Sequence, residues 1–406
     1  MGPSFNEQFD QHGVWRREFA QQLKRLADWM ATHDLMDAAV QERLQRLEDQ
    51  VRSDKVMVAF VAEFSRGKSE LINAIFFADY GRRIMPASAG RTTMCPTELG
   101  YDANVAPSLR LLPIETRLQM QSLAEWRVKA DRWHEIPLDV GNADQIAKAL
   151  EKVAEVRKVS LDNARALGFW HDDLTDENPV PDAQGMVEVP MWRHAIINIP
   201  HPLLKQGLVI LDTPGLNAVG AEPELTVNLI PQAHAVVFIL SADTGVTRSD
   251  LSIWREHLAI SPESVEARLV VLNKIDTLWD TLNTAEQVQS QMERQCATSA
   301  EMLGVSLDRV VPVSAQKGLV AKITADDVLL ETSGLPALEE ALAKGIMGRR
   351  QSILRAAVAT GVASLRTETS RVINIRRRDL DDQMAELRSL RGKNASVIES
   401  MRHRIE

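Results

Sequence analysis

Four short segments that occur in a fixed order constrain the fold of this chain more than any other feature. The first is a P-loop signature, in which an apolar run at 56–61 leads into residues 62–69, ending in Gly-Lys-Ser. A P-loop requires a strand, a loop and a helix in succession, and so belongs to α/β proteins. The other segments are Thr93, the Asp-Thr-Pro-Gly of 212–215 and the Asn-Lys-Ile-Asp of 273–276. Their order predicts a nucleotide-binding α/β domain with a mostly parallel sheet flanked by helices.

The P-loop residues suit a nucleotide triphosphate. Backbone N–H groups of such a loop, and of the helix that follows it, point at the phosphates. Lys68 is expected to bridge the β- and γ-phosphates, and the hydroxyl of Ser69 to ligate Mg²⁺. Ala62 replaces the first glycine of the signature, which is tolerated if its φ is negative. The predicted nucleotide-binding residues of this loop are Glu63, Phe64, Ser65, Arg66, Gly67, Lys68, Ser69 and Glu70.

The second group of predictions concerns the metal and the γ-phosphate. Asp212 ends the apolar run 208–211, where a carboxylate can reach the magnesium shell. Gly215 offers an unhindered N–H to the γ-phosphate, and that contact is lost on hydrolysis, so the following loop is predicted to be a switch. The predicted Mg²⁺ ligands are Ser69, Thr93 and Asp212.

The segment 273–276 predicts the base. The carboxylate of Asp276 matches the two adjacent donors of guanine, N1–H and N2–H₂. Adenine would leave this carboxylate unpaired, at a cost of roughly 1–3 kcal/mol. Lys274 can lie along the base and Asn273 can brace neighbouring loops, while Ser314 and Ala315 form a weaker match to the loop that closes over the base. The sequence therefore predicts a P-loop GTPase domain that binds GTP and GDP.

Composition narrows the remaining functional classes. The net charge of −9 argues against a nucleic-acid partner. The two cysteines cannot form a disulfide framework, which favours a reducing compartment. No apolar run approaches the ~18–20 residues that a membrane-spanning helix needs. These features predict a cytoplasmic protein, with peripheral association at the inner membrane left open.

The apolar pattern predicts three regions. Residues 5–52 read as two helices that are interrupted at 32–34, residues 53–348 form the GTPase domain, and residues 349–406 form one long helix. The N-terminal helices either cover the GTPase domain or join the C-terminal helix in a bundle, and we favour the bundle. Since the apolar pattern still runs at residue 406, we expect a stalk whose tip lies beyond it.

Two segments outside the motifs carry further expectations. The long interval between Thr93 and Asp212 predicts a helical insertion at about 115–190, with helices over 118–133 and 143–161. In the C-terminal helix, the three arginines at 376–378 are either a solvated coiled-coil face or a patch that contacts lipid, and we favour the solvated face.

The motifs together resemble those of the bacterial dynamin-like GTPases. The resemblance covers residues 55 to about 320 and rests on residues 63–74, 91–97, 211–217 and 241–247. It implies that Thr93 positions water and magnesium, that Ser65 helps to neutralise transition-state charge, and that the loop 243–250 reaches across a dimer of GTPase domains. It also implies a mechanochemical GTPase, in which domain pairing is coupled to movement of a helical bundle during membrane remodelling, with lipid contacted through the stalk tip.

One position departs from that family. Eukaryotic dynamins place a water-orienting glutamine where this chain has Phe64, and a phenyl ring cannot orient water. Arg66 is then either an arginine finger or a surface arginine. The predicted catalytic residues are Ser65, Arg66, Lys68 and Thr93. Two other functions are considered: a cytosolic scaffold that polymerises on GTP without membrane activity, as septins do, and a regulatory GTPase with a ribosomal target, which the acidic composition disfavours.

Overall fold

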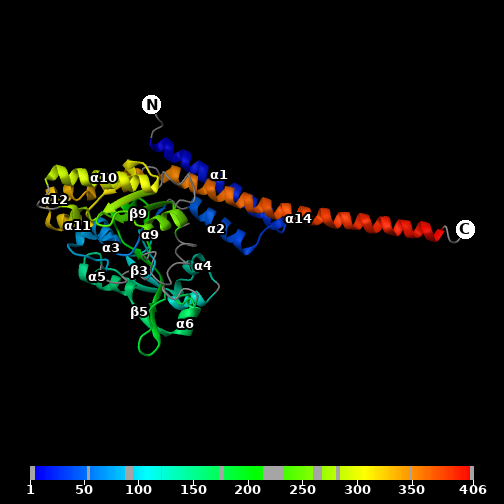
Figure 1. Ribbon diagram of the computed structural model, residues 1–406, viewed down its shortest axis with the longest axis horizontal. Coiled ribbons are helices and arrows are strands. Elements are labelled where there is room, and N and C mark those ends of the chain that lie inside the picture. Colours follow the sequence, from blue (N-terminus) through cyan, green and yellow to red (C-terminus); the bar gives the residue numbers. More distant parts are fainter. Residues whose placement is uncertain are drawn as a thin grey trace. The chain divides into compact units, whose positions relative to one another are not determined.

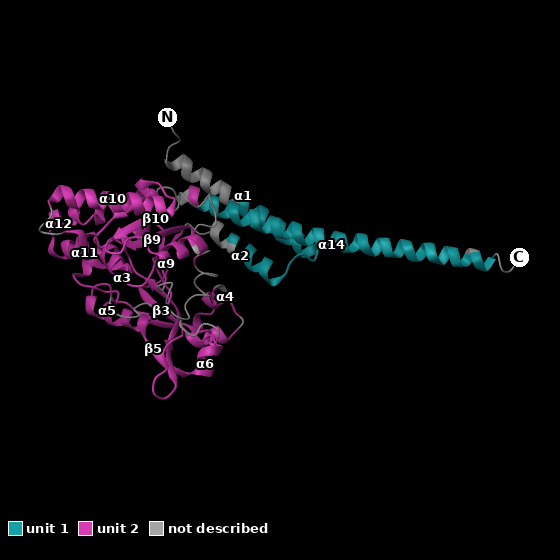
Figure 2. Cartoon of the chain, in the orientation of Figure 1, with its two compact units in different colours: residues 1–54, 354–406 teal, residues 55–353 magenta. Residues whose placement is uncertain are grey.

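The computed structural model describes residues 5–52, 55–86, 95–119, 121–172, 178–213, 230, 233–258, 268–279, 284–346 and 350–402. The chain forms two compact units, one of residues 1–54 with 354–406 and one of residues 55–353 (Figure 2). Each unit is described by itself. The expected fold class, a P-loop GTPase domain with an adjoining bundle of N- and C-terminal helices, is confirmed.

The larger unit is built on one sheet, which has nine strands among the described residues (Figure 1). Its parallel half has the order β11-β10-β9-β1-β8. These strands are rich in Val, Ile and Leu and are buried on both faces, as parallel strands between helices must be. Their bounds are β1 Val56–Ala62, β8 Leu208–Asp212, β9 Ala235–Ser241, β10 Arg268–Asn273 and β11 Val310–Pro312.

The other half of the sheet continues beyond β8 in the order β2-β7-β3-β4. Strand β2 runs antiparallel to β8 and parallel to β7, so the C-terminal end of β7 lies at the sheet edge opposite to that of β8. The bounds are β2 Thr97–Gly100, β3 Ser108–Pro113, β4 His134–Pro137 and β7 Trp192–Asn198.

The parallel strands bring several of the predicted motifs to one edge. Because the C-terminal ends of β1, β8, β9 and β10 meet there, so do the loops that follow them, and this edge is where open α/β sheets bind ligands. Helices pack on the sheet: the core joins Phe238 of β9 and Leu272 of β10 to Trp254 and Ala300. The helices of this region are α3 Lys68–Ile72, α7 Pro202–Lys205, α9 Arg248–Ile253, α10 Ala285–Leu303, α11 Ala315–Thr324, α12 Asp327–Thr332 and α13 Leu335–Glu340.

The insertion expected at about 115–190 contains helices, but it is not helical throughout. The segment alternates between helices and strands, and the predicted helix over 143–161 stops after residue 154. Residues 156–160 instead pair with 186–190 in a two-stranded antiparallel sheet, because Val159, Val187 and Val189 bury their branched side chains against Phe169. The helix predicted over 118–133 is reduced to a short one. The bounds are α4 Leu123–Val128, α5 Ala143–Glu151, β5 Val156–Ser160, α6 Leu161–Ala166 and β6 Met186–Pro190.

The smaller unit is the predicted helical bundle. Helix α1 Phe5–Thr32 and helix α2 Ala38–Arg52 are separated by the turn expected at 32–34. The third helix is the 53-residue α14 Arg350–Arg402. Apolar side chains from all three form one core, which includes Leu23, Met30, Val40, Leu44, Leu47, Val358 and Leu365.

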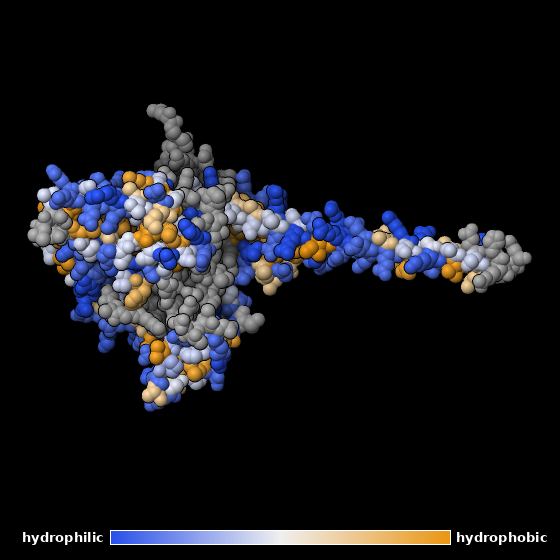
Figure 3. Space-filling view, in the orientation of Figure 1, coloured by the Kyte–Doolittle hydropathy of each residue, from blue (hydrophilic) through white to orange (hydrophobic). Residues whose placement is uncertain are grey.

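Helix α14 has two stretches of different character. Arg376 donates hydrogen bonds to the main-chain oxygens of His33 and Asp34, and so holds the turn that follows α1. Further along, Leu380, Met384 and Leu387 are 49–60 % exposed, and Figure 3 shows apolar side chains interspersed with charged ones on this stretch. No helix in the described ranges is both long enough and apolar enough to span a bilayer.

Candidate nucleotide-binding site

The P-loop has the backbone that its signature requires. Ala62 is the last residue of β1, so the missing first glycine falls in extended backbone, where alanine is unstrained. Ser65 and Gly67 have left-handed backbones, with φ of 65° and 85°. A Cβ atom on Gly67 would lie 2.4 Å from the side-chain nitrogen of Asn273. Glycine is therefore needed at 67 for two reasons, its φ and the close approach of Asn273.

Lys68 and Asp212 form a buried ion pair at the head of the site. The side chains are 8 % and 2 % exposed. Burial raises the pKa of Asp212, and the positive charge of Lys68 opposes that rise. Within the described ranges, the Oδ2 atom of Asp212 is buried without a hydrogen-bond partner. This orphaned carboxylate oxygen and the hydroxyl of Ser69, the residue after Lys68, are hard oxygen donors of the kind that Mg²⁺ prefers.

The base-reading segment is joined to the P-loop and to the segment at 314–315. The amide of Asn273 donates to the main-chain oxygen of Arg66 at 2.9 Å and accepts from the main-chain N–H of Ala315 at 3.0 Å. The Ser314 hydroxyl donates to Asp276 at 2.6 Å. Lys274 has a left-handed backbone, and its ammonium lies 3.4 Å from Asp243. Segments that are 207 residues apart are thus joined in one network of hydrogen bonds.

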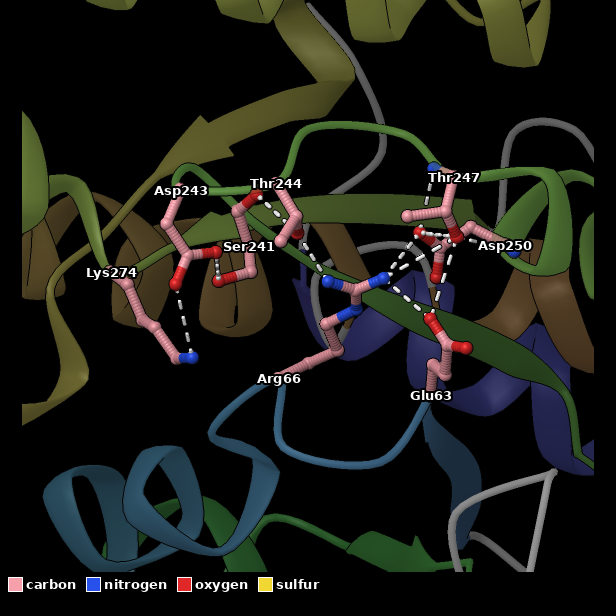
Figure 4. A network of polar contacts seen from close by, with 8 residues as sticks. All are labelled: Glu63, Arg66, Ser241, Asp243, Thr244, Thr247, Asp250 and Lys274. Carbon is pink, nitrogen blue, oxygen red and sulfur yellow. Dashed lines mark hydrogen bonds and ion pairs between the residues drawn. The ribbon is translucent and has the colours of Figure 1, made fainter.

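Arg66 does not take the surface position that was one of its two expected roles. It is 6 % exposed, and its guanidinium contacts Thr244, Thr247, Asp250 and Glu63 (Figure 4). The arginine is therefore turned toward the loop after β9, and these side chains hold its two terminal nitrogens, Nη1 and Nη2.

The loop 243–250 has an inward and an outward part. Asp250 is fully buried, so its carboxylate faces Arg66 rather than a partner molecule. Asp243, Thr244 and Arg248 are exposed. Contact across a dimer, which was expected of the whole range, is therefore not open to the carboxylate of Asp250 in this arrangement.

The other predicted residues have mixed outcomes. Phe64 and Ser65 are exposed at the tip of the P-loop, and the carboxylate of Glu70 is held by two nitrogens of Arg83. Thr93 and Gly215 lie outside the described residues. The nucleotide, metal and catalytic roles assigned to the site residues stay predictions.

Sequence reasoning missed two buried polar clusters. The first is the contact of Arg66 with Asp250, and its only sequence signal is the capping box Thr-x-x-Asp at 247–250, which marks the start of α9. The second is Glu98 on β2, which accepts from His194 at 2.9 Å and from Arg127. Burial alone would raise the pKa of Glu98, but the positive charge of Arg127 and the bond from His194 hold it well below its usual range.

Comparisons with known proteins include one family model that matches more than half of the chain. Residues 58–275 match the model of the dynamin family. An uncharacterised protein of Caldicellulosiruptor sp. is 21 % identical, covering 80 % of this chain and 64 % of that protein. Dynamin-like protein A of Bacillus subtilis is 25 % identical, covering 70 % and 24 %. A solved structure of an oligomerised bacterial dynamin pair is 15 % identical, covering 97 % and 53 %, with a TM-score of 0.46. The chain spans less than two thirds of the length of these proteins.

Proposed function

Since this chain belongs to the dynamin family, whose members are GTPases, we propose that it binds GTP and Mg²⁺ and hydrolyses GTP to GDP and phosphate. The observation that carries this proposal is the convergence at one sheet edge of the Lys68–Asp212 pair with the Asn273–Asp276 segment. The Lys68–Asp212 pair is suited to the phosphates and the metal, and the Asn273–Asp276 segment is suited to guanine. Residues 53–348 are proposed as the G domain, and residues 5–52 with 349–406 as its helical neck.

Guanine recognition would depend on Asp276 and its neighbour Ser314. The Ser314 hydroxyl donates to one carboxylate oxygen of Asp276, which orients the carboxylate. The carboxylate then accepts the two adjacent donors of guanine. Ala315 begins α11, and its N–H is held by Asn273, so the loop over the base is tied to the segment that reads it.

At the phosphates, Lys68 would change partners. In this structure its ammonium is paired with Asp212. We propose that on binding it moves to the β- and γ-phosphates, while Asp212, Ser69 and Thr93 hold the metal. Mg²⁺ supplies positive charge that neutralises the phosphate oxygens. Ser65, exposed at the loop tip, would donate toward charge that develops in the transition state.

The site lacks a residue that orients water at the usual place. Phe64 is 49 % exposed and offers no polar group. The buried Arg66 is not free to replace it, since Asp250 and Thr244 hold its guanidinium. We therefore propose that a second copy of the chain completes the site across paired G domains, through the outward residues Asp243 and Arg248, and that pairing is coupled to movement of the bundle.

The experiment for the catalytic proposal measures GTP turnover against protein concentration. We expect specific activity to rise with concentration, and a dimer to form with a transition-state mimic but not with GDP. Flat specific activity over a hundredfold range, with a monomer in every nucleotide state, would contradict pairing. The GTPase proposal itself would be contradicted if the wild-type protein hydrolysed no GTP, or if Lys68→Ala hydrolysed GTP as fast as the wild type.

Membrane remodelling is the cellular role that we propose, with peripheral attachment at the inner membrane. The alternative is a cytosolic scaffold that polymerises on GTP. Sedimentation of the full-length protein with liposomes and a GTP analogue separates the two roles. Nucleotide-dependent sedimentation only with liposomes supports membrane activity, and equal sedimentation without liposomes supports the scaffold.

A further inference from the structure

We propose that Asp250 is a positioning residue of the GTP site, which acts through Arg66 to hold the P-loop against the loop that follows β9. The proposal rests on the function proposed above, and it assigns a task to a carboxylate that makes no contact with the predicted nucleotide position. The evidence is a buried network that connects the P-loop to residues 244–250 (Figure 4).

The carboxylate of Asp250 is a fixed anchor. Its Oδ2 atom accepts from the hydroxyl and the main-chain N–H of Thr247, at 2.8 and 3.0 Å. The same atom accepts from Nη2 of Arg66 at 2.9 Å, and the two side chains are 0 % and 7 % exposed. A buried guanidinium needs a fixed anion beside it, because an unpaired buried charge is strongly destabilising. The side chain of Arg66 therefore cannot leave Asp250 without a cost.

Arg66 is itself a P-loop residue, so its contact with Asp250 restrains the P-loop backbone. Its side chain is held by the loop after β9, and its main-chain oxygen is held by Asn273 at 2.9 Å. The residues on either side, Ser65 and Gly67, both have left-handed backbones. A non-glycine residue keeps that conformation only where its surroundings impose it. Lys68 follows Gly67 and is two residues from Arg66. The position of this lysine, which is predicted to bind phosphate, therefore depends on where Arg66 is held.

The capping box explains only part of this arrangement. As the third residue of α9, Asp250 pairs with Thr247 and so caps that helix. A cap needs neither burial nor an arginine from a loop 184 residues away. In addition, Glu63 contacts both Arg66 and Thr247, so two P-loop residues take part in the network. Because two P-loop residues contact this network, it can fix the position of the P-loop rather than that of one side chain alone.

The test compares kcat, KM and the exchange of P-loop amide hydrogens in a set of variants. Asp250→Asn keeps the size of the side chain and removes its charge. We expect kcat/KM for GTP to fall at least tenfold at a temperature where the variant is fully folded, with faster amide exchange at residues 62–68 in the nucleotide-free protein. Unchanged kcat/KM and unchanged exchange would overturn the proposal.

A double variant tests whether Asp250 acts through Arg66. If it does, Asp250→Asn combined with Arg66→Met should be no less active than Arg66→Met alone, because the second change removes nothing further. Multiplicative losses would overturn the proposal. Should Asp250→Asn fail to fold, Arg66→Lys serves in its place, since one ammonium cannot reach Asp250, Thr244 and Glu63 together. Wild-type kinetics and exchange in Arg66→Lys would overturn it equally.

A matched control separates positioning from general loss of stability. Asn198 is a buried polar residue at the opposite edge of the same sheet. Its side chain accepts from the main-chain N–H of Asp102 at 2.7 Å and donates to the main-chain oxygen of Val105 at 2.8 Å. Asn198→Ala should lower the melting temperature and leave kcat/KM unchanged. An equal kinetic loss in this control would overturn the proposal.

A further variant distinguishes failure of the GTPase proposal from failure of the positioning role. Lys68→Ala should abolish GTP binding in the same assays. If Lys68→Ala behaves as wild type, the GTPase proposal falls. If Lys68→Ala is inactive while Asp250→Asn keeps wild-type kinetics and exchange, only the positioning role falls.

Discussion

The side-chain amide of Asn273 donates a hydrogen bond of 2.9 Å to the main-chain oxygen of Arg66, and thereby joins the base-reading segment directly to the P-loop. The side-chain oxygen of Asn273 accepts a hydrogen bond from the main-chain N–H of Ala315. One side chain at the end of β10 thus braces the loops for the phosphates and for the base.

The first prediction concerns that brace. Asn273→Ala should weaken GDP binding by about 10- to 100-fold, because removal of the amide leaves two main-chain groups without their partner, at roughly 1–3 kcal/mol. Isothermal titration calorimetry measures the change. Gly67→Ala should have a stronger effect, since its Cβ would lie 2.4 Å from the Asn273 nitrogen at a φ of 85°. Wild-type affinity in both variants would show that the brace has no part in binding.

The second prediction concerns the base. Asp276→Asn should weaken GTP binding and improve binding of xanthosine triphosphate, because the amide NH₂ can face the 2-oxo group of xanthine. Competition between the two nucleotides gives the measurement. Unchanged preference for GTP would mean that Asp276 does not read the base, although Ser314 holds it.

The third prediction separates binding from hydrolysis. Thr93→Ala should leave GTP affinity nearly unchanged while it lowers kcat, since the proposed role of this hydroxyl falls mainly in the transition state. Ser65→Ala should act in the same direction. Equilibrium binding and single-turnover hydrolysis, measured on the same samples, give the two values. A loss of affinity in Thr93→Ala as large as in Lys68→Ala would show that the threonine is misassigned.

The fourth prediction is a pH dependence of stability. Burial lowers the pKa of His234, which accepts from the main-chain N–H of Met57, to about 4. The folded state therefore keeps this ring neutral between pH 6.5 and 4, while the unfolded state takes up a proton. This contribution to the free energy of unfolding is fully present above pH 6.5 and is lost as the pH falls toward 4, on the order of 3 kcal/mol.

The control for this pH dependence is His234→Asn. Its amide oxygen can accept the same N–H, but it does not titrate. Denaturant unfolding at pH 7 and pH 5 should show a smaller difference in the variant than in wild type. An equal difference would assign the acid sensitivity to other groups.

The fifth prediction concerns the bundle. A Cβ atom on Gly361 of α14 would lie 2.5 Å from a methyl group of Leu47, whereas nothing lies within 4 Å of one on Gly392. Gly361→Leu should therefore destabilise the bundle by about 1–3 kcal/mol, and Gly392→Leu should leave it unchanged or slightly stabilise it. Limited proteolysis of α1 and α2 reports the difference. Equal protection in both variants would contradict the packing of α2 on α14.

The meeting of the motif segments at one sheet edge could be predicted from the sequence because their signals are local. The P-loop, the carboxylate at 212 and the segment 273–276 each follow an apolar run, and parallel strands bring their ends to one edge. The three bundle helices were predictable for a similar reason, since their apolar residues recur at helical spacing and all three were found in one core.

The tertiary structure alone decided the features that depend on distant partners. Residues 156–160 form a strand rather than a helix because 186–190 offers a pairing edge, and a weak local preference yields to that pairing. Arg66 is buried rather than exposed because Asp250, 184 residues away, supplies the charge that compensates it. The place of the motif segments in the fold could thus be predicted from short stretches of sequence, whereas the orientation of Arg66 depends on contacts that form only once the sheet has brought two loops together.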